Sequence, residues 1–125
     1  MKTAIIGSRN ITDHDLLREA VKGLPITAII SGGAAGVDKM AERYAQENDL
    51  PMTVINANWA KHGKQAGMIR NAEIVKQAEQ IIALWDGQSH GTAATIAMAK
   101  KAGKALKVIV PRTTGKEVQS QMSLF

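Results

Sequence analysis

The chain has 125 residues, 45% hydrophobic and 22% charged, an ordinary composition for one soluble globular domain. It contains no cysteine, which excludes disulfide bonds and thiolate chemistry. The apolar run near the first residue is too short for a signal peptide, and no stretch is long enough to span a membrane. We therefore expect a cytoplasmic protein with no membrane partner.

The net charge of +5 arises in one part of the sequence. Residues 1–99 hold ten Lys or Arg and ten Asp or Glu, whereas residues 100–125 hold six basic residues against Glu117. Cations near the carboxyl end of a helix are favourable, so a solvated helix end explains this excess. A DNA-facing patch is the alternative.

Five short apolar runs alternate with helical patterns. The runs predict strands over 3–6, 26–30, 52–55, 81–84 and 106–110. The helices are expected from Thr12 or Asp13 to about residue 23, from residue 37 to about 45, over about 68–79, and through an Ala-rich segment to Lys101, with a loop over 60–67. This alternation predicts an α/β fold whose parallel sheet of about five strands carries helices on both faces. Residues 1–111 form the expected domain, and 112–125 are expected to be a flexible tail.

Small and polar residues gather where four of the predicted strands end. Ligands of open α/β sheets bind outside the carboxyl ends of the strands, so we expect one site there. The candidate residues are Gly7, Ser8 and Arg9, then Ser31, Gly32, Gly33, Ala34, Gly36 and Asp38, then Trp59, and then Trp85, Asp86, Gly87, Ser89, Gly91 and Thr92.

The loop after the second strand, Ser31–Asp38, gives the clearest indication of a ligand. Paired glycines let the backbone approach a ligand, and the start of the next helix attracts anions. A tight turn that uses glycine only for its positive φ is the competing explanation. The loop matches neither the dinucleotide fingerprint nor the P-loop, which argues against both. Asp38 either holds the loop in shape or contacts the ligand, and its place near the helix start favours the first.

The loop after the fourth strand offers a second helix start at Gly91 and Thr92. Asp86 accepts hydrogen bonds from a ribose or caps its own turn, and the residues alone do not decide between the two. Arg9 and Arg70 are the candidate phosphate clamps, because Arg70 is expected at a helix start, where a cation is unfavourable without a function.

Aromatic and histidine residues are few. Trp59 and Trp85 both follow strand ends, where they either stack on a base or cover the edge of the sheet. The three histidines have no metal-ligand spacing, so we expect neither a metal site nor a cofactor.

Together these motifs resemble the SLOG superfamily, and within it the small YspA-like group. The resemblance rests on the loop residues above together with Gly63-Lys64-Gln65-Ala66-Gly67 and Arg70-Asn71, and it extends over residues 1–111. It implies a Rossmann-like three-layer fold that binds a nucleotide or a nucleotide-derived ligand. Relatives in this superfamily include DNA-processing DprA proteins and cytokinin-activating phosphoribohydrolases.

The hydrolase relatives carry a catalytic glutamate in a P-G-G-x-G-T-x-x-E loop. Gly91-Thr92 aligns with its G-T, but Thr95 stands at the position of the glutamate. Without that carboxylate, cleavage of an N-glycosidic bond lacks its expected acid or base. The sequence therefore assigns no catalytic residue and leaves enzymatic activity open.

The last five residues, Gln121, Met122, Ser123, Leu124 and Phe125, resemble the pentapeptide that binds the bacterial sliding clamp, commonly Q-L-S/D-L-F. A disordered segment that ends in two adjacent apolar residues can anchor in a partner's pocket. Packing of these residues onto the domain or a subunit interface is the alternative.

Three function hypotheses follow. The first is a nucleotide-ligand-binding sensor or adaptor recruited to the sliding clamp, and the second is a phosphoribohydrolase-like enzyme. The third is a DprA-like protein that contacts single-stranded nucleic acid through residues 100–116 and the tryptophans. A homo-oligomer is compatible with all three.

Overall fold

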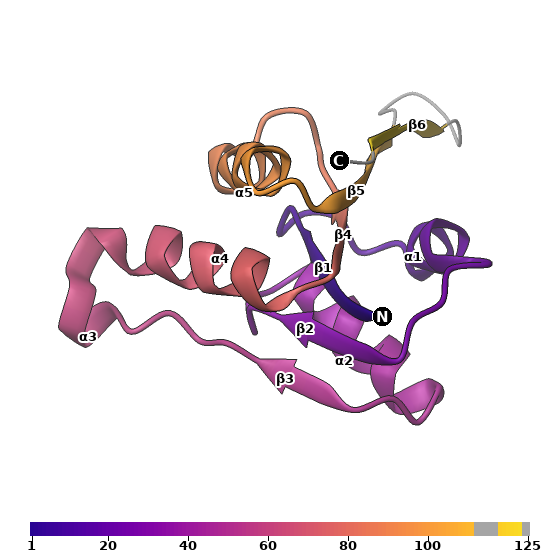
Figure 1. The fold of residues 1–125 in the computed structure, drawn as a ribbon, viewed down its shortest axis with the longest axis horizontal. Helices are drawn as coiled ribbons and strands as arrows, with labels where there is room; N and C mark the ends of the chain where they lie inside the picture. The colour runs from indigo at the N-terminus through magenta and orange to yellow at the C-terminus, as the bar shows by residue number, and fades with distance from the viewer. Residues whose placement is uncertain (112–117, 124–125) are drawn as a thin grey trace.

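A computed structural model describes residues 1–111 and the backbone of residues 118–123. Its six strands form one sheet in the order β3-β2-β1-β4-β5-β6 (Figure 1). The first five strands are parallel, as the sequence predicts. In chain order the elements are β1 Lys2–Gly7, α1 His14–Val21, β2 Ala28–Ser31, α2 Val37–Glu47, β3 Met52–Val54, α3 Trp59–His62, the 3₁₀ turn η1 Gly63–Gln65, α4 Ala66–Gln77, β4 Gln80–Leu84, α5 His90–Lys101, β5 Ala105–Pro111 and β6 Val118–Ser123.

The predicted elements are present with small changes at their ends. Of the two candidate caps of α1, Asp13 serves, because its Oδ1 accepts from the backbone N–H of Asp15 at 3.0 Å. The prediction of a loop over 60–67 is wrong, since α3, η1 and the first residues of α4 occupy it. In the described ranges, no helix is long and apolar enough to cross a membrane.

Alternating side chains of the strands build two cores on opposite faces of the sheet. Ile5 and Ile82 face α1 and α2, whereas Ile6 and Ile81 face α4 and α5. Because side chains alternate along a strand, a strand buried on both faces is apolar over most of its length, as β4 is from Ile81 to Leu84. The result is the three-layer Rossmann-like arrangement (Figure 1).

The strand order changes direction between β1 and β4. The chain builds outward from β1 through β2 to β3, then returns to the other side of β1 to begin β4. The loops that leave these two neighbouring strands therefore diverge at the carboxyl edge, which is the topological switch point where ligands of such sheets bind. Ser8 joins the two loops: its N–H donates to Leu84 O and its Oγ accepts from Asp86 N, each at 3.0 Å.

Part of the expected tail forms a strand. The backbone of Val118–Ser123 pairs antiparallel with β5, so that Gln121 lies opposite Val108. This pairing satisfies the N–H and C=O groups of β5 that would otherwise form an open sheet edge. Of the clamp-like pentapeptide, Leu124 and Phe125 lie outside the described residues, and the clamp-binding prediction stays a prediction.

Candidate functional site

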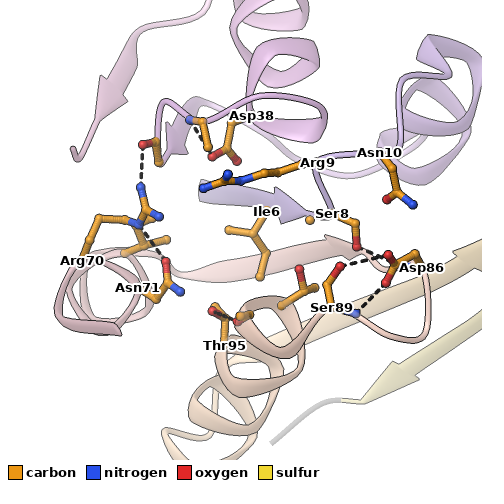
Figure 2. Close-up of a pocket in the computed structure, with 16 residues that line it drawn as sticks. Ile6, Ser8, Arg9, Asn10, Asp38, Arg70, Asn71, Asp86, Ser89 and Thr95 are labelled. Carbon is orange, nitrogen blue, oxygen red and sulfur yellow. Dashed lines mark hydrogen bonds between the residues drawn. The ribbon is translucent and has the colours of Figure 1, made fainter. Parts of the chain in front are cut away.

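A cavity of about 400 Å³ opens at the switch point (Figure 2). Its size falls within the roughly 300–1,000 Å³ that is usual for small-molecule sites. It is lined by Ile6, Gly7, Ser8, Arg9, Asn10, Gly32, Ala34, Asp38, Arg70, Asn71, Ile74, Asp86, Ser89, Gly91, Thr92 and Thr95.

Close packing of backbone against backbone brings together the loops beside the cavity. Gly36 has a φ of +71°, and a Cβ there would overlap the backbone of Arg9. A Cβ at Gly7 would overlap Leu84 O and meet Val37 Cγ2 at 2.7 Å. Both glycines are needed for close approach, so the loops after β1 and β2 lie in contact.

Asp38 holds the loop after β2 in shape, as the sequence predicts. Its side chain is 7% exposed, and Oδ2 accepts from Ala34 N at 3.0 Å. Burial raises the pKa of this carboxyl; the hydrogen bond from Ala34 and the charge of Arg70 oppose the shift only in part.

Arg70 reaches the same loop from α4. One terminal nitrogen, Nη1, donates to Gly32 O at 2.7 Å, and Nε donates to Asn71 Oδ1 at 2.8 Å (Figure 2). The expectation that Arg70 opens a helix is wrong, because α4 begins at Ala66 and places Arg70 in its second turn. The helix dipole therefore does not oppose this cation, and its position is explained by its contact with Gly32.

Asp86 organises the loop after β4. Its Oδ1 accepts from Gln88 N at 2.8 Å and Ser89 N at 2.7 Å, and its Oδ2 accepts from Ser89 Oγ at 2.9 Å. These bonds, led by the one from the Ser89 backbone, lower the pKa of Asp86 to about 2. Of the two roles that the sequence allows for Asp86, the structure shows the turn cap; the carboxylate also lines the cavity.

The amino end of α5 presents open donors to the cavity. Ser89 is its N-cap and makes no side-chain cap hydrogen bond. Within residues 1–111 no group accepts from the backbone N–H of His90, Gly91 or Thr92. Such unpaired N–H groups, together with the helix dipole, favour an anion.

Arg9 supplies a second cationic group. It is exposed, and its guanidinium forms no hydrogen bond or ion pair with any residue that the structure describes. Figure 2 shows it extending across the cavity on the side of Arg70. The carboxylates of Asp38 and Asp86 accept hydrogen bonds from their own loops, whereas the Arg9 guanidinium has no such partner among the described residues.

The cavity gathers most of the predicted site residues but not all of them. Gly7, Ser8, Arg9, Gly32, Ala34, Asp38, Arg70, Asn71, Asp86, Ser89, Gly91 and Thr92 line it. Ser31, Gly33, Gly36 and Gly87 do not, and the last three have positive φ and shape the loops instead. Ser31 is buried, and its Oγ accepts from Gly33 N at 3.3 Å.

Neither tryptophan lines the cavity. Trp85 packs against the core beside α4 and α5, and its Nε1 donates to Ser89 O at 3.0 Å. Trp59 is 56% exposed on α3. The sequence allows Trp85 either to stack on a base or to cover the edge of the sheet, and its packing in the structure agrees with the second role.

The cavity is also lined by Ile6, Asn10 and Ile74, which the sequence motifs do not include, and by Thr95, which the motifs distinguish only by the absence of a glutamate. Asn10 directly follows Gly7-Ser8-Arg9, so extending this motif by one residue would have predicted it. Ile74 lies one turn after Arg70 on α4, which only the helix register reveals. The Thr95 Oγ1 donates to Gly91 O at 2.8 Å and supplies no carboxylate to the cavity.

The strand order and the cavity at the switch point place this protein among the Rossmann-like α/β proteins with a candidate ligand site at the carboxyl edge of the sheet. The model of the YspA, cpYpsA-related SLOG family matches residues 1–62. The Gene 61 protein of Mycobacterium phage D29 is 34% identical over 113 residues, covering 82% of this chain and 90% of that protein. The chain therefore belongs to the SLOG family, as its motifs indicate.

A solved structure resembles the whole domain. DNA processing protein A from Helicobacter pylori, in a study of its single-stranded DNA binding mode, has a TM-score of 0.66 and 25% sequence identity. The match covers 94% of this chain and 68% of the other.

Proposed function

We propose that the cavity binds the phosphate of a nucleotidyl group and that single-stranded DNA is the ligand that presents it. The observation that carries this proposal is the set of open N–H groups at the start of α5, which line the same cavity as Arg9 and Arg70. Backbone donors and guanidinium groups are the usual partners of phosphate oxygens in protein–DNA contacts.

The solved relative supports single-stranded DNA as the source of the phosphate. Its domain superposes on nearly all of this chain, and its study concerns single-stranded DNA binding. A cavity that is open at the carboxyl edge admits one phosphate while the strand continues over the surface. A free nucleotide is the second candidate, because about 400 Å³ accommodates a small molecule as well.

Arg9 offers the cleanest test because no described residue depends on its side chain for a hydrogen bond. We expect Arg9→Ala to weaken binding of a fluorescent oligothymidylate about 10-fold to 100-fold, the usual effect of losing a charge-assisted hydrogen bond of about 1.5–3 kcal/mol. Fluorescence anisotropy at fixed salt measures this, and thermal unfolding should be unchanged.

Lys22→Ala is the matched control. Lys22 is an exposed cation at the carboxyl end of α1, and so lies at the opposite edge of the sheet. The proposal fails if the two variants lose equal affinity, because the binding would then follow net charge alone. Competition with thymidine monophosphate separates the candidates: full displacement at low concentration identifies a free nucleotide as the preferred ligand.

We also propose that residues 121–125 bind a sliding clamp, on the strength of their match to the Q-L-S/D-L-F pattern. Gln121–Ser123 pair with β5, so deleting the whole motif would also remove part of a strand. The double variant Leu124→Ala, Phe125→Ala avoids this. It should abolish binding to immobilised clamp in surface plasmon resonance without lowering Tm, and a lowered Tm with intact binding would refute the proposal.

A further inference from the structure

A second surface adjoins the cavity, formed by Trp59 and Lys61 of α3, Lys64 of η1, and Met68 and Ile69 of α4. We refer to it as the α3–α4 surface. Trp59 is 56% exposed, Met68 44% and Ile69 43%, and these are among the most exposed large apolar side chains of the described chain. Figure 1 shows α3 beyond the amino end of α4, away from the two core layers. Exposed apolar groups that gather in this way mark an interaction site.

The indole of Trp59 is more than half exposed and lies beside α4. Asn58 caps α3, its Oδ1 accepting from Lys61 N at 3.1 Å, which fixes the short helix that carries the ring. One ring atom, Cη2, lies near Gly67, where a Cβ would stand 3.5 Å from it. With 56% of the side chain exposed, the ring offers a broad, already oriented apolar surface to a flat partner.

This ring lies one helical turn from the cavity. Gly67 shares a face of α4 with Arg70 and Asn71, which follow it by three and four residues and line the cavity. At 1.5 Å per residue these steps amount to about 4.5–6 Å along the helix axis. That spacing lies between one and two nucleotide steps of a stacked strand, at about 3.4 Å each.

The charge of this region suits a polyanion. From residue 50 to residue 72 the sequence holds no Asp or Glu, but it holds Lys61, Lys64 and Arg70. Both lysines are exposed, and neither belongs to an ion pair among residues 1–111. An aromatic ring flanked by unpaired lysines is the combination with which proteins bind single strands without reading their sequence.

We infer that a single strand whose phosphate occupies the cavity continues over the α3–α4 surface and stacks a base on Trp59. The inference rests on the proposed function and adds a second contact to it. The cavity holds the phosphate, and the tryptophan holds a base one or two nucleotides away.

A length series tests the second contact separately from the first. Wild-type protein should bind thymidine nucleotides more tightly as they lengthen from the monophosphate to six nucleotides. Trp59→Ala should remove this gain, weakening the six-nucleotide ligand at least about five-fold, the lower end of the usual effect of removing a stacked aromatic, while leaving binding of thymidine monophosphate unchanged. Trp59→Phe should restore most of the gain, because phenylalanine keeps a ring.

Fluorescence gives an independent readout. The sequence holds two tryptophans, so in a Trp85→Phe background Trp59 is the sole indole. Stacking of a base should quench its emission as the six-nucleotide ligand is added, and thymidine monophosphate should leave it unquenched. Emission that stays constant while anisotropy reports binding would overturn the inference.

The binding measurements also distinguish failure of the stacking inference from failure of the cavity proposal. If Arg9→Ala weakens every ligand but Trp59→Ala weakens none, the inference is wrong and the cavity proposal stands. If wild-type protein binds no oligonucleotide, both are wrong. Sedimentation velocity tests whether a second copy of the chain occupies the α3–α4 surface instead. We expect a monomer, and a dimer that Trp59→Ala dissociates would overturn the inference.

Discussion

Two carboxylates line the cavity, and their surroundings shift their pKa values in opposite directions. Asp38 is buried, which raises its pKa. Asp86 accepts three hydrogen bonds from Gln88 and Ser89, which lower its pKa to about 2. An acid with a pKa of about 2 stays ionised near neutral pH and is a poor general acid. Its effect is to fix the loop that leads into α5.

Asp86→Ala tests this role through stability. The folded-state pKa of about 2 lies below the ordinary value of 3.8, so the ionised group stabilises the fold above pH 4 and the stabilisation is lost as pH falls toward 2. We expect a loss of about 0.5–2 kcal/mol at pH 7, as for other side chains that cap backbone N–H groups. Urea unfolding measures the difference between variant and wild type. This difference should narrow as pH falls from 4 to 2, and a constant difference would show that the hydrogen bonds to the carboxylate contribute nothing.

At the scale of elements, the amino end of α5 is where binding and stability can be separated. A Cβ at Gly91 would meet no heavy atom within 4 Å, so a side chain fits there. A carboxylate in the first turn is favourable to the helix by about 0.3–1 kcal/mol, and glycine is a poor helix former. The same carboxylate would occupy and repel the proposed phosphate site.

Gly91→Glu should therefore bind oligothymidylate at least about ten-fold more weakly while its Tm stays equal to or above that of wild type. Gly91→Gln is the control, because it has the same shape without the charge. Anisotropy and thermal unfolding check both variants. If Gly91→Glu and Gly91→Gln bind equally well, no anion binds at this helix end.

The elements also show how far sequence reasoning extends. The five parallel strands were predictable because each is a compact apolar run, buried on two faces in the case of β4. The segment over 60–67 was not, because α3 and η1 bury no residue and so leave no periodic apolar pattern. Most cavity residues were predictable because they lie in the loops that follow the strands. The direction in which Trp85 turns depends on its bond to Ser89 O in the same loop and on its packing against the core beside α4 and α5, and the second is a tertiary contact that no local pattern shows.

At the scale of the molecule, the lysines of the charge excess that the structure describes lie away from the cavity. Lys100 and Lys101 end α5, and the Lys107 amine donates to Ala20 O near the carboxyl end of α1 at 3.0 Å. These cations lie where helix carbonyls accumulate, the simpler of the two explanations that the sequence allows. The described lysines at helix ends are thus at the amino edge of the sheet, whereas the start of α5 and Arg9 are at the carboxyl edge.

This separation of the two edges provides the most direct test of where DNA binds. Amide chemical shifts in ¹⁵N-labelled protein would be followed as a six-nucleotide oligothymidylate is added. Our account predicts the largest changes at Asn10, Gly91 and Thr92, with little change at Lys100 and Lys101. Changes centred on residues 100–107, with none at the start of α5, would contradict it.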